Sequence, residues 1–170
     1  MNAVLARWNG LKAKEAAEEI LPCCGSRTWA KQMASRRPIL GEAALLAACD
    51  TVWNNLSETD WEEAFRSHPR IGESASQAAA AARSKEWSGE EQRKVGSADE
   101  DVKLDLAEAN RAYEQRFHRI FIVCATGKSA PEILQILERR MRNPESTELL
   151  EAAEEQRKIA QLRLKKWLAS

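Results

Sequence analysis

His68 is the residue of this chain best suited to giving or taking a proton. It is one of two histidines among 170 residues, and a free imidazole titrates near pH ~6.5, so both of its protonation states are accessible at neutral pH. Pro69 follows directly, and because proline restricts the preceding residue to extended backbone, we expect a rigidly placed imidazole. The alternative is structural, with His68 hydrogen-bonded only to its own loop. The second histidine, His118, shares no ligand-like spacing with His68 or the cysteines, which indicates a surface or helix-end position and no metal site.

A second group of polar side chains comprises Ser88, Glu91 and Gln92. Ser88-Gly-Glu-Glu91 has the form of a capping box, which predicts that a helix begins at Ser88. The positive end of the helix dipole would keep a carboxylate ionised there, so Glu91 could accept hydrogen bonds from substrate N–H groups. Gln92 offers both a donor and an acceptor to an amide or urea edge. The capping role alone would also explain Glu91.

Arg163 falls on the apolar stripe of the helix expected at the end of the chain, and Gln156 lies on the same stripe. A cation placed there points inward, where its guanidinium could bind a substrate carboxylate. Two structural alternatives stay open: the arginine lays its stem on the core and exposes its head, or it pairs with a glutamate.

The elements that must position these residues are predicted to be helices. Only 7 Gly and 5 Pro interrupt a sequence rich in Ala, Glu, Leu, Lys and Arg, which favours helix over strand. The fold class is therefore all-α: a single-domain bundle (residues 1–170) of about eight helices, with an irregular His-Pro loop at 66–72 and a short extended segment near 120–125. Apolar spacing and start or stop signals predict helices near 12–21, 26–36, 41–53, 57–65, 78–83, from 88, 102–117, 129–141 and 146–167.

Composition excludes several classes of protein. The 26 basic and 26 acidic residues cancel, so no general field attracts nucleic acid or an anionic membrane. Apolar runs such as 120–125 are far shorter than the ~20 residues that cross a bilayer. The first residues lack the pattern of a secretory signal, so we expect a cytoplasmic protein.

The cysteines and tryptophans are expected to be mainly structural. Cys23, Cys24, Cys49 and Cys124 include no Cys-x-x-Cys pair, which favours buried thiols over a disulfide framework or a zinc site. Most of the six tryptophans are predicted to lie in the core, whereas Trp87 looks exposed and could edge a pocket.

Several short motifs follow one another in a recognisable order. They are Cys23-Cys-Gly-Ser26 with Trp29, Arg37-Pro38, Trp61 with Ala64-Phe65, His68-Pro-Arg-Ile-Gly72, Ser88-x-x-Glu91-Gln92, Asn110-x-x-Tyr113, Phe121-Ile-Val-Cys124 with Gly127-Lys128, and Arg163-Leu164. In this combination the chain resembles the family of 2-oxo-4-hydroxy-4-carboxy-5-ureidoimidazoline (OHCU) decarboxylases over nearly its whole length. The His-Pro-Arg-Ile-Gly and Ser-x-x-Glu-Gln elements together are the most specific part. Two departures are His118, where relatives commonly have glycine, and the somewhat long, Ala-rich stretch between His68 and Ser88.

The resemblance implies an all-helical, usually dimeric carboxy-lyase that needs no cofactor or metal. It would convert OHCU to (S)-allantoin and carbon dioxide in urate (purine) degradation, with the substrate and a second copy of the chain as its partners. His68 would be the catalytic proton donor, and Glu91 and Arg163 would also be catalytic. The substrate-binding residues would be Pro69, Ser88, Gln92 and the backbone of Phe121, Ile122, Val123, Cys124 and Ala125.

Two other function classes are weighed against this one. A non-catalytic helical interaction module derived from such an enzyme would keep the pocket residues only for stability and would bind a protein through an exposed apolar patch. Nucleic-acid binding is disfavoured by the zero net charge and the lack of a basic stripe.

Overall fold

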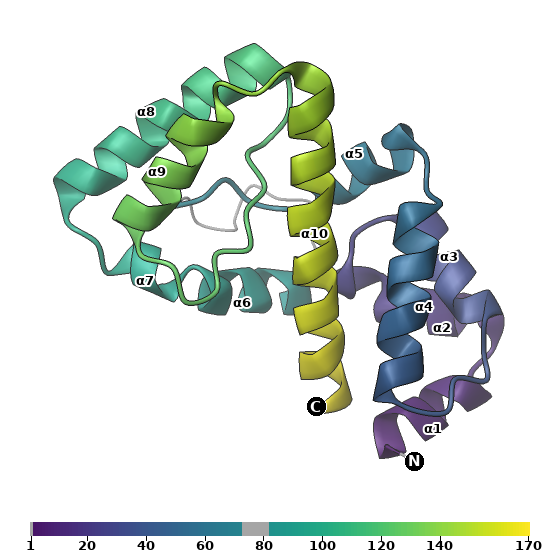
Figure 1. The fold of residues 1–170 in the computed structure, drawn as a ribbon. Helices are drawn as coiled ribbons and strands as arrows, with labels where there is room; N and C mark the ends of the chain where they lie inside the picture. The colour runs from purple at the N-terminus through teal and green to yellow at the C-terminus, as the bar shows by residue number, and fades with distance from the viewer. Residues whose placement is uncertain (1, 73–81) are drawn as a thin grey trace. The chain divides into compact units, whose positions relative to one another are not determined.

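A computed structural model describes residues 2–72 and 82–170, and every regular element within those ranges is a helix (Figure 1). The elements are α1 (Ala3–Gly10), α2 (Ala13–Ile20), the 3-10 helix η1 (Leu21–Cys23), α3 (Arg27–Ser35), α4 (Glu42–Asn54), α5 (Glu58–Arg66), α6 (Ala82–Glu91), α7 (Arg93–Gly96), α8 (Glu100–Phe117), α9 (Ala130–Arg140) and α10 (Glu145–Leu168). The prediction of an all-α fold is confirmed. Most of the run predicted to be helical at 78–83, and with it most of the Ala-rich stretch, lies outside the described residues.

Helix α1 is not among the helices predicted from the sequence. Asn2 caps it, because its side-chain oxygen accepts hydrogen bonds from the N–H groups of Val4 (2.9 Å) and Leu5 (3.2 Å). Only Leu5 and Trp8 of this short helix are buried, so its apolar periodicity is weak and the cap is its clearest signal.

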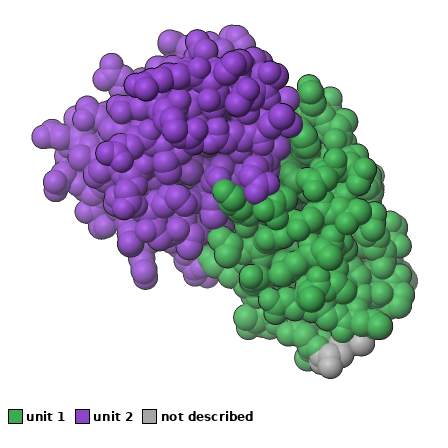
Figure 2. Space-filling view, in the orientation of Figure 1, with its two compact units in different colours: residues 1–64, 157–170 green, residues 65–156 purple. Residues whose placement is uncertain are grey.

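The chain divides into two compact units, coloured separately in Figure 2. Unit 1 comprises residues 1–64 and 157–170, and unit 2 comprises residues 65–156. Helix α10 supplies residues to both units.

Tryptophans build much of the core of unit 1. The rings of Trp8 and Trp167 meet edge to face with centroids 5.6 Å apart, and Trp53 stacks on Trp61 at 5.8 Å. The indole N–H of Trp8 donates to the carbonyl of Ala16 at 2.9 Å. The predicted core positions of Trp8, Trp53 and Trp167 are confirmed, since all are buried.

The four cysteines are buried free thiols, as predicted. Burial, followed by the nearby Asp50 carboxylate, raises the pKa of Cys49 to about 12. Burial likewise raises the pKa of Cys24. These thiols therefore stay protonated at neutral pH and behave as small apolar side chains.

Unit 2 packs α8 and α9 side by side (Figure 1) over an aromatic cluster. Tyr113 lies 4.8 Å from Phe117 and 5.1 Å from Phe121, measured between ring centroids. The predicted capping box at the start of α9 is confirmed: the N–H of Glu132 donates to the Ser129 hydroxyl at 3.3 Å, and the Glu132 carboxylate accepts from the Ser129 N–H at 2.9 Å.

A buried ion pair links α9 and α10 within unit 2. Nε and Nη2 of Arg140 donate to Oε1 of Glu148 at 2.9 and 2.5 Å, and both side chains are fully buried. The Tyr113 hydroxyl donates to the same carboxylate oxygen. Nη1 of Arg140 donates to the carbonyl of Ile122 at 2.6 Å, so this charged cluster anchors the irregular segment 120–125.

No helix in the described ranges combines the length and the apolar character needed to span a bilayer.

Candidate active site

His68 lies in irregular backbone after α5, and its ring is almost completely buried, with 8% of the residue exposed. Its Nε2 is 2.6 Å from Oε1 of Gln156, which belongs to α10 and is fully buried. The backbone N–H of His68 donates to the carbonyl of Phe65 at 3.2 Å. Pro69, the predicted substrate contact that follows, is half-buried. The imidazole is thus held at a defined position by a residue 88 positions away in the sequence.

The remainder of the His-Pro loop is held by α8. The Arg70 guanidinium donates to both carboxylate oxygens of Glu114, at 2.5 and 3.0 Å. Nδ2 of the buried Asn110 donates to the carbonyl of Ile71 at 3.2 Å. Two side chains one turn apart on α8 therefore fix the loop just after the histidine.

Gln92 connects the same loop to the junction of α6 and α7. Its Oε1 accepts a hydrogen bond from the backbone N–H of Gly72 at 3.0 Å. Gly72 has φ +85°, a conformation that favours glycine, and Cγ1 of Val95 is the nearest atom to a Cβ added there, at 3.9 Å. Gln92 therefore lies beside the His-Pro loop.

The predicted helix start at Ser88 is wrong. Ser88 lies inside α6, its carbonyl accepts from the N–H of Gln92 at 3.1 Å, and Glu91 is the last residue of the helix. Nothing between Ala82 and Glu91 breaks a helix that is already under way, so Ser-x-x-Glu has no capping role here. The Glu91 carboxylate stands at the negative end of the α6 dipole, the opposite of the predicted electrostatics.

Trp87 and Ser88 are both buried, with 7% and 3% of each residue exposed. The prediction that Trp87 is exposed is wrong, since its ring is covered and the Arg83 guanidinium carbon lies 5.9 Å from its centroid. Ser88 lies on the buried side of α6, one turn before Gln92.

The five residues Phe121–Ala125 are buried and non-helical. The N–H of Cys124 donates to Oε2 of Glu155 at 2.7 Å, and its carbonyl accepts from Nζ of Lys128 at 2.7 Å. Among the described residues, the backbone N–H groups of Ile122, Val123 and Ala125 have no hydrogen-bond partner.

The end of α6 is electrostatically coupled to this segment. Burial is the main cause that raises the pKa of the Cys124 thiol, and the charges of Glu155 and Glu91 raise it further, while Lys128 lowers it. A carboxylate acts in this way on a group that is close to it. The charge of Glu91 is the smallest of these causes.

Glu155 and Gln156 join the two halves of the cluster. These consecutive residues of α10 contact Cys124 and His68 respectively. The sequence signal for Gln156 was its polar side chain on an apolar stripe. Glu155 has no such signal, because the Cys124 backbone that it binds lies 31 residues away in the sequence.

Arg163 belongs to unit 1, whereas His68 and Glu91 belong to unit 2. The prediction that it points inward is confirmed, because the residue is fully buried. Its Nη1 donates to the carbonyl of Pro22 at 3.3 Å.

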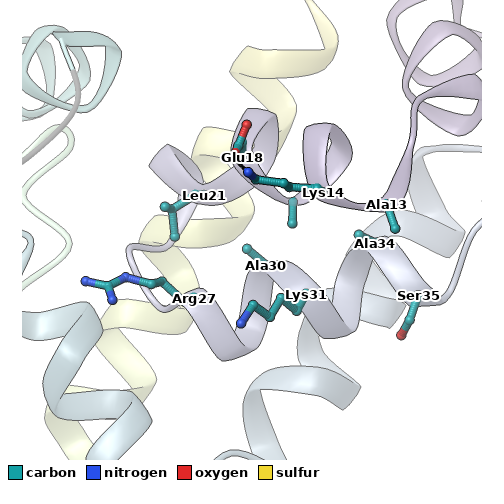
Figure 3. Close-up of a pocket in the computed structure, with 10 residues that line it drawn as sticks. Ala13, Lys14, Glu18, Leu21, Arg27, Ala30, Lys31, Ala34 and Ser35 are labelled. Atoms are coloured by element: carbon teal, nitrogen blue, oxygen red, sulfur yellow. Dashed lines mark ion pairs between the residues drawn. The ribbon is translucent and has the colours of Figure 1, made fainter.

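A separate pocket of about 380 Å³ lies between α2 and α3 in unit 1 (Figure 3). Four alanines, Leu21 and Ser35 line it together with the charged residues Lys14, Glu18, Arg27 and Lys31. None of the predicted site residues lines it. Within the described ranges, no group of three or more His, Cys, Asp or Glu side chains is arranged to hold a metal ion.

The described helical fold thus holds a buried imidazole against the amide oxygen of Gln156, and the next residue back on α10, Glu155, holds the backbone of Cys124. The sequence profile of OHCU decarboxylase matches residues 9–165. The chain belongs to the OHCU decarboxylase family.

Individual relatives agree with this membership. The chain is 37% identical over 144 residues to the uric acid degradation bifunctional protein TTL of Arabidopsis thaliana. The aligned region covers 85% of this chain and 44% of that protein. This chain thus spans less than half the length of that relative. It is similar to a crystal structure of OHCU decarboxylase in the presence of (S)-allantoin, with 34% identity, a TM-score of 0.77, and coverage of 90% of this chain and 99% of the other. A crystal structure of (S)-allantoin synthase, at 18% identity and a TM-score of 0.72, shares the fold over 96% of this chain and 53% of its own.

Proposed function

We propose that this chain decarboxylates OHCU to (S)-allantoin and carbon dioxide, as a step of urate degradation. The observation that carries the proposal is the cluster in unit 2, where Glu155 and Gln156 hold the 121–125 backbone and the His68 ring. Membership of the OHCU decarboxylase family and the similarity to a structure determined with (S)-allantoin support this substrate.

The site offers donors and acceptors that suit the ring and ureido edges of OHCU. The N–H groups of Ile122, Val123 and Ala125 would donate to carbonyl oxygens of the substrate, and the Glu91 carboxylate would accept from the ureido N–H groups. Gln92 keeps its amide NH₂ available as a donor, since its oxygen accepts from Gly72. Pro69, Ser88, Phe121 and Cys124 would complete the walls of this site.

The reaction requires positioning and one proton transfer. When the C–C bond to the carboxylate breaks, carbon dioxide leaves and the electron pair passes into the conjugated ring, which delocalises it. The His68 imidazolium then gives its proton to the ring carbon that becomes the stereocentre, and the electrons of the N–H bond stay on nitrogen. Because the imidazole is held on one side of the site, the proton reaches one face and one enantiomer forms.

Arg163 would bind the substrate carboxylate. The family resemblance implies this role for Arg163. A fully buried guanidinium is the side chain best suited to grip a carboxylate through two parallel hydrogen bonds.

The finer features of the proposal follow the family resemblance. We propose that residues 1–170 act as a single catalytic domain, that the enzyme is a cytoplasmic homodimer, and that it works without a cofactor or metal. The family profile spans residues of both compact units, which supports a single catalytic domain. Sedimentation of the purified chain tests the dimer.

The test is the rate of OHCU loss with freshly made substrate and purified protein. We expect the wild type to accelerate loss of OHCU and release of carbon dioxide in chelator-treated buffer, and His68→Ala to be nearly inactive while keeping its helical circular dichroism. His118→Ala is the matched control, because it removes the other, exposed histidine. Loss of OHCU at the spontaneous rate with the wild type would contradict the proposal and favour a non-catalytic interaction module.

A further inference from the structure

The hydrogen bond between His68 and Gln156 determines which ring nitrogen can react. Oε1 of Gln156 lies 2.6 Å from Nε2 of His68, and both residues are buried. A carbonyl oxygen can only accept a hydrogen bond, so Nε2 must carry a hydrogen. The proton that the ring exchanges with a substrate therefore belongs to Nδ1.

Gln156 is itself firmly placed. It is fully buried on α10 beside Ala152 and Ala153, and the preceding residue, Glu155, holds the N–H of Cys124 at 2.7 Å. An amide does not titrate, so this acceptor keeps the same charge at every pH at which the protein is folded. A carboxylate at this position would instead add a charge and attract a second proton to the ring.

The backbone on the other side of the ring is held as well. Asn110 and Glu114 on α8 bind Ile71 and Arg70, directly after the His-Pro dipeptide. The ring is therefore held through its own Nε2 and through the loop that carries it, which leaves little freedom to present Nε2 to a substrate.

We propose that Gln156 is a positioning residue that keeps His68 in the Nε2–H form and directs Nδ1 to the substrate. This inference rests on the proposed function. In the proton-transfer step the Nδ1–H bond of the imidazolium breaks and the C–H bond of the product forms. The electrons of the N–H bond stay on Nδ1, and the neutral ring that results is the Nε2–H tautomer that Gln156 stabilises.

The first test is nitrogen NMR of the imidazole rings in the wild type. The ¹⁵N shifts distinguish the two neutral tautomers, and the exposed His118 gives a reference signal in the same spectrum. We expect neutral His68 to be almost entirely Nε2–H, and this population to fall in Gln156→Met, which keeps the length of the side chain and removes the acceptor. A predominant Nδ1–H form in the wild type would overturn the inference.

The second test is kinetic and uses a matched control on the same helix. Gln156→Met should lower kcat on the order of 10²-fold and change KM by less than about threefold, since substrate contacts are retained. Gln161→Met removes a glutamine whose Nε2 donates to Asp50 at 2.7 Å in unit 1, and should leave both constants unchanged. Gln156→Glu keeps an acceptor oxygen, so its kcat should exceed that of Gln156→Met.

The results separate this inference from the proposed function. An active Gln156→Met with wild-type kcat and an unchanged tautomer would overturn the role of Gln156 and leave the decarboxylase proposal standing. A wild type that shows the Nε2–H tautomer and no activity on OHCU would contradict the proposed function instead.

Discussion

Glu91 shows how the environment of one residue changes its expected role. At the last position of α6 its charge opposes the helix dipole, so it is not placed there to stabilise the helix. We propose that Glu91 instead serves the substrate, as the family resemblance implies.

Glu91→Gln tests this explanation. We expect kcat/KM for OHCU to fall on the order of 10²-fold, because the ureido group loses its charged acceptor. The free energy of unfolding should stay the same or rise by ~0.5 kcal/mol, because a negative charge leaves the C-terminal end of a helix. Glu90→Gln, one residue earlier and exposed, is the control for activity. A loss of stability together with activity would indicate a structural role instead.

His118 ends α8 in the left-handed conformation, with φ 54°. This strain explains why glycine suits the position, and the predicted location of His118 at an exposed helix end is confirmed. His118→Gly should therefore raise the free energy of unfolding by ~0.5–1 kcal/mol, the relief of the strain less the added chain entropy. Urea denaturation measures this change in the free energy of unfolding, and the activity should stay unchanged. A destabilised variant would refute the strain argument.

The inward position of Arg163 could be predicted from helical spacing, whereas the position of Glu91 could not. Spacing identifies the buried face of a helix that is long and regular, as α10 is. A capping box is a four-residue pattern whose residues are also tolerated inside helices, so its meaning depends on whether the preceding residues are helical. Ser129-Ala-Pro-Glu132 does begin a helix, as predicted, because Pro131 is compatible with the first turn of a helix and not with its interior.

At the scale of elements, the segment 120–125 is held by side chains that are distant in sequence. Its lack of helix was predicted from a short apolar run before Gly127, but its partners on α9 and α10 were not. Arg140 and Glu155 contact it across 18 and 31 residues. No local pattern encodes contacts of this range.

The ion pair of Arg140 and Glu148 should be important for stability. Arg140→Met leaves Glu148 buried without its cation, which should lower the free energy of unfolding by ~3–5 kcal/mol. The neighbouring Arg139 pairs with Glu151 at the surface, so Arg139→Met should cost less than ~1 kcal/mol. Urea denaturation of both variants makes the comparison, and equal effects would show that the Arg140 cluster does not anchor the fold.

At the scale of the whole molecule, the division into two units could not be predicted from the sequence. The sequence shows no Ser/Gly-rich linker, and α10 contributes residues to both units. Composition nevertheless predicted the all-helical class, since it depends on sums of propensities rather than on individual contacts. The burial of the four cysteines as free thiols was also predicted, from the absence of a Cys-x-x-Cys pair.

Those thiols predict how stability depends on pH. The pKa of Cys49 is raised from 9.0 to about 12 in the folded protein, so its stabilising effect is fully present below pH 9 and is lost as the pH rises toward 12. The unfolded chain releases this proton first. We expect urea denaturation between pH 8 and pH ~10.5 to show a smaller loss of stability for Cys49→Ala than for the wild type. Parallel curves would contradict the assigned burial.

The handedness of the product tests the central claim most directly. If His68 gives its proton from one side of an enclosed site, allantoin formed by the wild type under fast turnover is predominantly the (S) enantiomer, seen by circular dichroism or chiral chromatography. His68→Ala should give racemic product at the spontaneous rate. Racemic allantoin from the wild type, formed faster than without protein, would contradict the account.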